Sequence, residues 1–490
     1  METIIFAEHS SALPFWQRQG TVGKTLIYLD AHLDVQLVSE KRIAALRNCR
    51  TAEEVATLEK PHHMLPDWGY SYSIEDFLYP AYCLGMISRL IWVSPHQDNQ
   101  DNLEQSTQKT LQKLQAMEGV SLEDLSSFKR VGNILAGKLL GLEVLICDYR
   151  DLAKLQLPED SLIDVDIDYF IELPADVPWI DPQEVFNSLQ NLSVKPGFVT
   201  LTRSVSSGYT PLRYSFIADY LAALWEGNVL NSSHYSRLFQ FDKQLLEGNS
   251  EAVVSGCLKE LEKFPQCAAT YYLLSLAEND VKLAQEYQTQ AANLDINYQP
   301  SILRSISEFA SRELKFESEQ LAELEKQLST GNIHEEELAI AHVTLGLLYS
   351  KLGDFRKVFK HHQMYKKKGE RHPQLNFRLG NLLLQAGYPQ RATRFLNEAL
   401  KDDMTACGAH SLLGRIYAKN GDLKQACEHF LQVSKIMPAF APPVNVLAKI
   451  YRQIGDEENS QIMYKRYQKI QLATAILTQK LEDVLKVVQV

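Results

Sequence analysis

Acidic residues and histidines alternate in two short segments of the first half of the chain. One segment reads Asp30-Ala31-His32-Leu33-Asp34, and the other reads Asp164-Val165-Asp166-Ile167-Asp168. Because alternate side chains of a strand share one face, each segment is predicted to gather its ionisable groups at the carboxyl end of a strand. Such groups are costly to bury without a partner, and a bound cation would offset that cost.

A third ionisable pair, Glu8-His9, follows the aliphatic run of residues 3–6. Groups of this kind at three strand ends are what a two-metal site in the crevice beyond parallel strands requires. Mostly carboxylate donors with one or two imidazoles suit Mn²⁺ better than zinc, and two such ions can activate water for attack on an electrophilic carbon. The alternative is a set of turn and capping carboxylates at strand ends.

The elements that must position these groups are short. Aliphatic runs without alternation are typical of buried parallel strands, and they occupy residues 3–6, 26–29, 90–93, 143–146, 162–165 and 198–201. Helices are predicted between them at residues 41–47, 74–86 and 125–140. This alternation predicts a doubly wound α/β domain over residues 1–224 with a mainly parallel sheet. The polar segment 95–118 is predicted to be an insertion or a solvated helix.

The second half, residues 225–490, is helical and repetitive. Two series of small residues have a period of 34, and they are Gly346, Gly380, Gly414 and Ala448, then Gly353, Gly387, Gly421 and Gly455. The first series is expected to let paired helices approach, and the second to form the turns between them. The pattern resembles the tetratricopeptide repeat, most clearly over residues 338–470. Residues 265–297 resemble a degenerate repeat, and residues 469–490 are predicted to form a capping helix.

Composition narrows the class of protein. Lys and Arg total 50 against 61 for Asp and Glu, a formal net charge of −11, which makes a general nucleic-acid binder a poor prediction. The apolar stretches are short or interrupted by charges, so no membrane span is expected. The start lacks the pattern of a signal peptide, and seven scattered cysteines indicate reduced thiols. We therefore expect a cytoplasmic protein. The basic run of residues 360–372 is expected to be a solvated helix end or, alternatively, a site for an acidic peptide.

The motifs of the first half resemble those of the arginase (ureohydrolase) superfamily, and more closely those of the arginase-like family that includes peptide arginases. The resemblance covers nearly all of residues 1–215. The matching segments are Glu8-His9-Ser10-Ser11-Ala12-Leu13-Pro14-Phe15-Trp16, Asp30-Ala31-His32-Leu33-Asp34, Glu75-Asp76-Phe77-Leu78-Tyr79-Pro80-Ala81, Ile91-Trp92-Val93, Asp164-Val165-Asp166-Ile167-Asp168-Tyr169-Phe170, and Arg203-Ser204-Val205-Ser206-Ser207-Gly208-Tyr209-Thr210-Pro211.

This resemblance implies an enzyme that uses two Mn²⁺ ions to hydrolyse the arginine side chain of a peptide to ornithine and urea. The metal ligands it implies are His9, Asp30, His32, Asp34, Asp164 and Asp166. Asp168 shares their predicted face and would become a ligand if the register shifted by two residues. The His-Glu motif that holds guanidinium in arginase has no counterpart near residues 203–211, which leaves Glu8 and Glu75 as candidate anchors for the guanidinium.

Other residues are candidates for proton transfer and for contacts with the substrate. His63, or alternatively His62 or His96, is a candidate to protonate the leaving amine. Arg203, Ser204 and Tyr209 are candidate contacts for the substrate backbone. The repeats are expected to recruit an arginine-containing peptide, most economically a precursor peptide. The alternatives are a hydrolase for a free guanidino or amidino compound, and a non-catalytic repeat scaffold.

Overall fold

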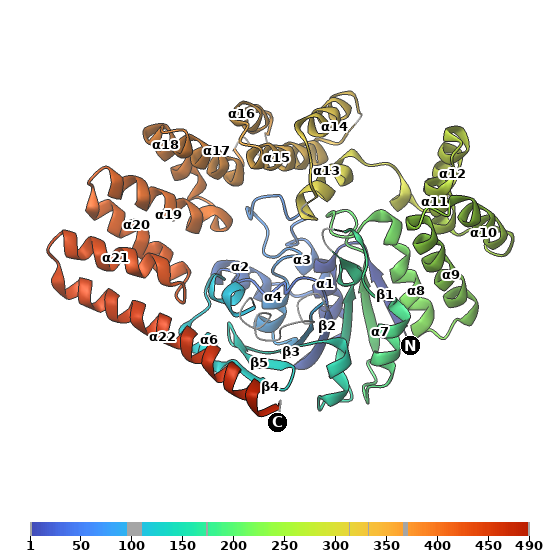
Figure 1. The fold of residues 1–490 in the computed structure, drawn as a ribbon, viewed down its shortest axis with the longest axis horizontal. Coiled ribbons are helices and arrows are strands. Elements are labelled where there is room, and N and C mark those ends of the chain that lie inside the picture. The colour runs from blue at the N-terminus through green and yellow to red at the C-terminus, as the bar shows by residue number, and fades with distance from the viewer. Residues whose placement is uncertain are drawn as a thin grey trace. The chain divides into compact units, whose positions relative to one another are not determined.

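The computed structural model describes residues 2–95, 110–172, 175–312, 314–331, 333–365 and 371–488. The chain divides into two compact units, of which the first joins Met1–His9 to Leu157–Leu314 and the second joins Ser10–Gln156 to Lys315–Val490. Each unit therefore takes segments from both sides of residue 224 and combines strands with helices. The two units are described separately (Figure 1).

The first unit contains three parallel strands. They run in the order β1 (Glu2–Phe6), β10 (Phe198–Thr202) and β7 (Leu162–Asp166), and Thr200 pairs with both Ile4 and Asp164. Branched aliphatic residues such as Val199 and Leu201 are fully buried, as expected of parallel strands covered on both faces. Helix α8 (Phe216–Trp225) packs on β1 and β10, and α7 (Pro182–Gln190) packs on α8. A small antiparallel pair, β8 (Ile171–Glu172) and β9 (Val177–Pro178), follows β7.

Helices complete the first unit. They are α9 (Val229–Leu246), α10 (Ser250–Lys263), α11 (Ala268–Ala277), α12 (Val281–Leu294) and α13 (Ile302–Ser311). Helices α8 to α12 pack on one another in chain order, and the predicted degenerate repeat at residues 265–297 contains α11 and α12. Buried His234 bonds to Glu260 at 2.8 Å and Arg237 donates two hydrogen bonds to the same carboxylate, so this buried charge is paired.

The second unit contains strands in the order β2 (Lys24–Leu29), β3 (Ile87–Val93), β6 (Leu142–Cys147), β5 (Ile134–Leu139) and β4 (Lys129–Val131). The pairs β2·β3 and β3·β6 are parallel, whereas β5 and β4 are antiparallel additions. Short helices lie in the same segment, namely α1 (Ala12–Arg18), α2 (Glu40–Arg47), α3 (Ala52–Ala56), α4 (Leu78–Cys83) and α6 (Leu122–Ser127). The predicted α/β class with mainly parallel strands is confirmed.

Two helix predictions in this segment need correction. The helix predicted at residues 125–140 is wrong, because α6 ends at Ser127 and the chain then forms β4 and β5. Gly132 adopts a φ of +60°, which reverses the chain between the two strands. The helix predicted at residues 74–86 shortens to α4, because Asp76 accepts a hydrogen bond from the Ser73 amide and forms a turn ahead of it. The predicted insertion at residues 95–118 lies largely outside the described residues.

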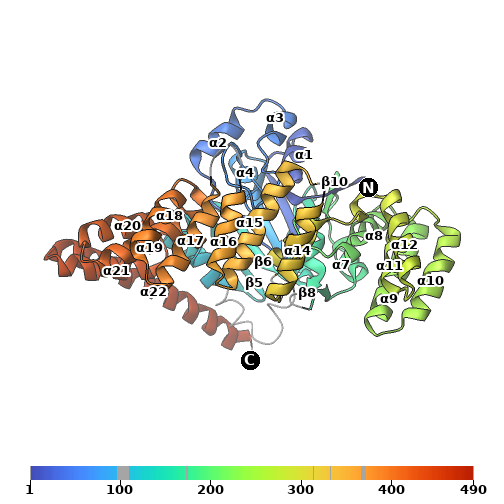
Figure 2. The same ribbon diagram turned by 90° about the horizontal axis from the view of Figure 1, so that it is seen from above.

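The repeats occupy the rest of the second unit as helical hairpins. Their helices are α14 (Ser318–Thr330), α15 (Glu335–Lys351), α16 (Phe355–Met364), α17 (Pro373–Gln385), α18 (Pro389–Ala399), α19 (Asp403–Lys419), α20 (Leu423–Ile436), α21 (Ala441–Gln453) and α22 (Glu457–Val488). Successive hairpins follow one another in a row (Figures 1 and 2). The predicted all-helical repeat region is confirmed, and residues 469–488 lie within α22.

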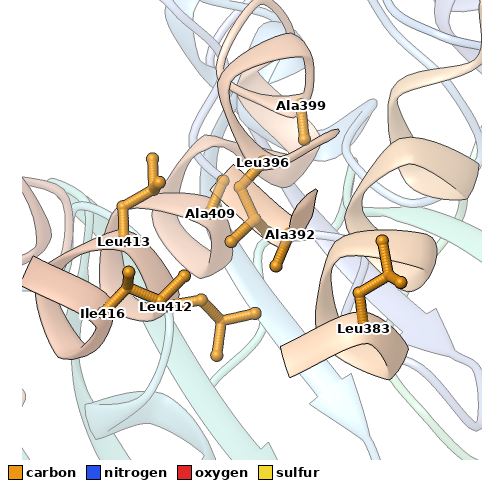
Figure 3. Close-up of a cluster of buried hydrophobic side chains, with 8 residues drawn as sticks. All are labelled: Leu383, Ala392, Leu396, Ala399, Ala409, Leu412, Leu413 and Ile416. Carbon is orange, nitrogen blue, oxygen red and sulfur yellow. The ribbon is translucent and has the colours of Figure 1, made fainter. Parts of the chain in front are cut away.

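Both glycine series have the roles that their period predicts. A Cβ added at Gly414 would come within 2.9 Å of the Phe430 ring, so this glycine permits close packing of α19 on α20. Gly421 has a φ of +83° in the turn between these helices, and Gly353, Gly387 and Gly455 repeat that conformation. Between α17 and α19, a buried cluster fills the space with aliphatic side chains (Figure 3). It contains Leu383, Ala392, Leu396, Ala399, Ala409, Leu412, Leu413 and Ile416.

Histidines pair inside two of the hairpins. Nδ1 of His342 lies 3.1 Å from Nδ1 of His361, and Nδ1 of His410 lies 2.8 Å from Nδ1 of His429. The two pairs are separated by 68 residues, which is two repeat periods. Each contact requires one ring to donate a proton and the other to accept it, so both rings of a pair cannot be cationic at once without losing the bond.

The repeats also pack against the strand-bearing segment of the second unit. Leu122 of α6 joins Ala441, Val444 and Ile470 in an apolar cluster, and the Gly119 amide donates to the Ile436 carbonyl at 2.7 Å. In the predicted basic run, Lys360 pairs with Glu325 and Arg371 donates to the carbonyls of His362 and Gln363. Lys366, Lys367 and Lys368 lie outside the described residues. Among the described helices, none has the length and apolar character needed to cross a bilayer.

Candidate metal centre

Strand β7 presents two buried carboxylates at its carboxyl end. Ile163 and Val165 point into the core, and the alternation of the strand therefore places Asp164 and Asp166 together on its other face. Both carboxylates are held by hydroxyls of the first unit, since Thr200 donates to Asp164 and Ser204 donates to Asp166 at 2.5 Å. Asp164 and Asp166 thus share one face of the strand, as the alternation in the sequence predicts.

His9 lies against both of these carboxylates. It begins a short 3-10 helix, His9–Ser11, after β1, and its Nε2 lies 2.6 Å from Asp164 and its Nδ1 3.1 Å from Asp166. Burial alone would lower the pKa of His9, but the two carboxylates raise it well above its usual value. A ring with a carboxylate at each nitrogen retains both protons unless a cation replaces one of them. The first unit thus brings together His9, Asp164 and Asp166.

The other alternating segment is not a strand. Strand β2 ends at Leu29, and residues 30–34 form the loop that follows it. Asp34 adopts a left-handed φ of 46°, an uncommon conformation for a residue with a side chain. The prediction that a strand face gathers Asp30, His32 and Asp34 is therefore wrong, although the loop still brings them close.

A tyrosine links the carboxylates of this loop. The Tyr28 hydroxyl lies 2.6 Å from Asp30 and 2.7 Å from Asp34, and the Asp30 carboxylate also accepts the His32 amide at 2.5 Å. His32 Nδ1 is 3.5 Å from the same carboxylate, and its side chain is 42% exposed. One phenolic proton serves only one carboxylate at a time, so a cation near this pair would relieve the repulsion between them.

These two groups of side chains fit a hard divalent cation as donor sets. The first unit offers an imidazole with buried carboxylates, and the second offers the Asp30 and Asp34 carboxylates with the His32 imidazole. Oxygen-rich sets with imidazole suit Mn²⁺, whereas structural zinc favours sulfur and nitrogen donors. These are the donor types on which the predicted Mn²⁺ pair depends, and the metal itself stays a prediction.

Two candidate catalytic carboxylates lie in the first unit. Glu8 Oε1 accepts the Ser207 amide at 2.9 Å, while the buried Oε2 has no hydrogen-bond partner among the described residues. Burial raises the pKa of Glu8 to about 7, against the hydrogen bonds from Ser207 that lower it. Asp168 is buried in the 3-10 helix Ile167–Phe170, and its amide donates to Asp166 at 3.2 Å. Asp168 therefore follows the strand and does not continue its face.

The other two candidates, His63 and Glu75, lie in the second unit on the loop between α3 and α4. His63 is buried and stacks on His62, with ring centroids 4.6 Å apart. Burial, reinforced by His62, Lys60 and His32, lowers the pKa of His63 well below its usual value. Burial raises the pKa of Glu75, and Lys60 and His32 act in the opposite direction. Both side chains thus lie within electrostatic reach of His32.

Sequence reasoning missed several residues that shape these groups. Tyr28 precedes Asp30 by two residues on the strand side, so the same alternation could have identified it. Thr200 is the register partner of Asp164, which no local pattern reveals. Arg203, a candidate contact for the substrate backbone, instead donates two hydrogen bonds to Asp219 of α8, at 2.8 and 2.9 Å. Ser204 contacts Asp166, and like Asp34 it has a left-handed φ, of 48°.

The comparisons with known proteins concern the helical half. A search of curated proteins found no match. Solved structures with some likeness include YrrB, a TPR protein with an unusual peptide-binding site, at 16% identity over 46% of this chain and 97% of that one, with a TM-score of 0.24. PilF of Pseudomonas aeruginosa has 16% identity over 46% and 98%, with a TM-score of 0.25. These TM-scores are low, so the likeness to these structures is slight. Residues 409–439 match the family model of the tetratricopeptide repeat, in agreement with the 34-residue period.

Proposed function

We propose that the protein is a Mn²⁺-dependent peptide arginase, which hydrolyses arginine side chains of a peptide to ornithine and urea. The observation that carries the proposal is the burial of His9 after β1, of Asp30 after β2, and of the Asp164 and Asp166 carboxylates at the end of β7, in the segments that resemble arginase-like enzymes. A purely structural role would not require a buried carboxylate at each ring nitrogen of His9.

The proposed ligands of the two ions are His9, Asp30, His32, Asp34, Asp164 and Asp166. Asp168 is a further candidate, because it is a buried carboxylate directly after β7. When bound, the metal pair would supply an activated water for attack on the guanidinium carbon.

The protein's own residues have separate proposed roles. Glu8 is the first candidate to hold the guanidinium, because its buried Oε2 offers an acceptor beside the loop of residues 203–211. Glu75 is the second candidate for this role. His63 is the candidate to supply a proton to the leaving amine, and burial keeps its ring away from bulk water.

The repeats are the proposed binding site for the peptide. Tetratricopeptide arrays generally present extended surfaces for peptide or protein partners, and residues 409–439 carry the family signature. A precursor peptide with arginines beyond its bound segment would meet both parts of the protein. The tetratricopeptide match supports a general protein-binding role, and recruitment of an arginine-containing peptide is the more specific proposal.

Mass spectrometry of arginine-containing peptides incubated with the protein and Mn²⁺ tests the activity. Conversion of arginine to ornithine predicts a loss of about 42 Da per arginine, with release of urea. The control is the same peptide with lysine in place of arginine, which must keep its mass. Release of urea from free arginine but not from peptides would select the small-molecule hydrolase instead.

The competing proposal is a non-catalytic repeat scaffold, which the tetratricopeptide match favours by itself. The two proposals differ in metal content. A scaffold with a decayed centre should bind fewer than one Mn²⁺ per folded chain, whereas the enzyme should bind two, as elemental analysis after dialysis would measure.

A further inference from the structure

A loop of the second unit, residues 58–77, lies between the repeats and the loop of residues 30–34. It begins after α3, ends at α4 and is closed at its neck, where the Lys60 amide donates to the Tyr72 carbonyl at 2.8 Å and the Ser71 amide to the Leu58 carbonyl at 2.7 Å. The loop carries His63 and Glu75. It contacts the repeats on one side and leads into the contacts with residues 30–34 on the other.

Two polar side chains of the repeats bind the backbone of this loop. His372 donates from Nε2 to the Met64 carbonyl at 2.7 Å, and the Asp402 carboxylate accepts the Asp67 amide at 3.2 Å. Both are almost fully buried, at 0% and 3% exposure. Because backbone groups must be satisfied when buried, these two bonds fix where the loop can lie.

The two contacts of the His372 ring determine its tautomer. Its Nδ1 accepts the Gln374 amide at 3.2 Å at the start of α17, so the proton must be on Nε2, which faces Met64. Asp402 likewise combines two tasks, because one oxygen caps α19 through the Met404 amide while the other binds the loop. Residues that begin two repeat helices therefore also hold the loop.

Apolar and ionic contacts reinforce this docking. Met64 packs on a buried cluster of Ala339, Val343, Tyr365 and Leu375 from the repeats. Within the loop, buried Lys60 pairs with Asp67. Arg42 of α2 donates to Asp67 at 3.2 Å and to Asp76 at 3.0 Å. Such a network has little freedom to shift in part, since each charge depends on its neighbours.

The far end of the loop reaches the segment of candidate ligands. The Leu78 amide, in the first residue of α4 after the loop, donates to the Asp34 carbonyl at 3.3 Å, and the Phe77 ring at the end of the loop lies 6.5 Å from the ring of Tyr28, which bonds to Asp30 and Asp34. Asp34 needs this support because its left-handed backbone is strained. A displacement of the loop would therefore disturb residues 30–34 directly.

We infer that His372 and Asp402 of the repeats are positioning residues, which hold the 58–77 loop and its His63 and Glu75 against residues 30–34. The consequence for catalysis rests on the proposed function, whereas the docking of the loop does not. In this arrangement the repeats are part of the apparatus that shapes the candidate centre, in addition to any role in binding a peptide.

Variants can separate loop docking from repeat folding. Asp402→Asn keeps a side-chain oxygen to cap α19 but places an amide donor opposite the Asp67 N–H, so it selectively breaks the loop contact. His372→Ala removes the donor to Met64, and His372→Gln restores an N–H at a similar reach. The matched control is Asp422→Asn, which also caps a repeat helix, α20, through the Gln425 amide.

Amide hydrogen exchange of the full-length protein tests the docking. We expect exchange in residues 58–77 to rise about tenfold in Asp402→Asn and His372→Ala, with Asp422→Asn unchanged and His372→Gln close to the wild type. Unchanged exchange in both loop variants would overturn the inference. So would a rise that extends equally over α17 and α19, because that result would indicate unfolded repeats.

Peptide hydrolysis provides the second measurement. We expect the two loop variants to lower kcat about tenfold with little change in KM and with the same Mn²⁺ content, and His372→Gln to recover most of kcat. Unchanged kcat despite faster exchange would overturn the positioning role. If the wild-type protein hydrolyses no arginyl peptide, the proposed function fails, and hydrogen exchange alone decides the inference.

Discussion

The ends of the strands and the tetratricopeptide repeats handle backbone strain and buried charge in opposite ways. Among the described residues of α15 to α22 and their turns, left-handed backbone occurs only at glycines, such as Gly353 and Gly421. Beyond the strands, Asp34 and Ser204 adopt it with side chains attached. A glycine would remove this backbone strain at Asp34 and Ser204, but it would also remove the side chains that bond to Tyr28 and Asp166.

Buried polar groups show the same difference. In the repeats, buried histidines pair with each other, with a side-chain amide, as His362 does with Asn376 at 2.7 Å, or with a backbone carbonyl, as His372 does with that of Met64. At the strand ends, two carboxylates lie against His9 and two against Tyr28. The partners of the buried histidines are therefore neutral groups in the repeats and carboxylates at the strand ends.

The largest effect is expected for Asp164→Asn. This change keeps the shape of a buried residue but removes a proposed ligand, so bound Mn²⁺ should fall below two per chain and hydrolysis should drop roughly 1,000-fold or more. Elemental analysis and the peptide mass shift measure these results. Asp403→Asn, on the exposed start of α19, is the control. Full metal content in Asp164→Asn would refute its role as a ligand.

The next effect is expected for Leu396→Ala, in the cluster between α17 and α19. Leu396 is fully buried, and its truncation should leave a cavity that lowers the free energy of unfolding by about 2–5 kcal/mol. Denaturant unfolding followed by circular dichroism measures the loss. Metal content should remain unchanged at a temperature where the variant is folded. A loss of metal would show that this repeat core also supports the candidate metal site.

Two glycines with the same backbone conformation, one after β10 and one in a repeat turn, allow the cost of an added side chain to be compared between the two regions. Gly208 has a φ of +86° and Gly421 a φ of +83°, but a Cβ at Gly208 would lie 2.6 Å from the backbone of Ser307 and Glu308, whereas Gly421 is open. Gly421→Ala should cost about 1 kcal/mol from strain, and Gly208→Ala about 2 kcal/mol more from overpacking. Thermal unfolding midpoints compare them. Equal losses would show that crowding by α13 is unimportant.

The smallest effect is a dependence of stability on pH in the repeats. Burial, with His342 nearby, lowers the pKa of His361 to about 3, against Glu325, and Lys360 and Lys357 lower it further. A histidine that stays neutral when folded contributes stability above its unfolded pKa of about 6.5, and that stability is lost as the pH falls toward the folded value. His361→Gln should flatten this decline by about 1 kcal/mol at pH 5 in denaturant titrations. Exposed His334→Gln should leave the decline unchanged.

The sequence predicted elements best where one local period dominates. The 34-residue series located the repeats, and the aliphatic runs located β1, β2, β3, β6, β7 and β10. It failed at residues 125–140, where a turn at Gly132 divides an apolar stretch into strands that pair with each other. Composition alone does not distinguish these strands from a helix.

For the candidate centre, the types of residue were predictable and their local geometry was not. Asp164 and Asp166 alternate on β7 as expected, but Asp30, His32 and Asp34 lie on a loop held by Tyr28. The contact between His372 and Met64 joins residues 308 positions apart, and no pattern within either segment implies it. Long-range contacts of this kind come from packing, which local periodicity does not record.

The interleaving of the two units has a practical consequence for fragments of this protein. A fragment that stops before residue 315 would leave Met64 and Leu122 without the apolar partners that α15, α17, α21 and α22 supply. A fragment that starts there would expose those same partners to solvent. We therefore expect either piece alone to aggregate on expression.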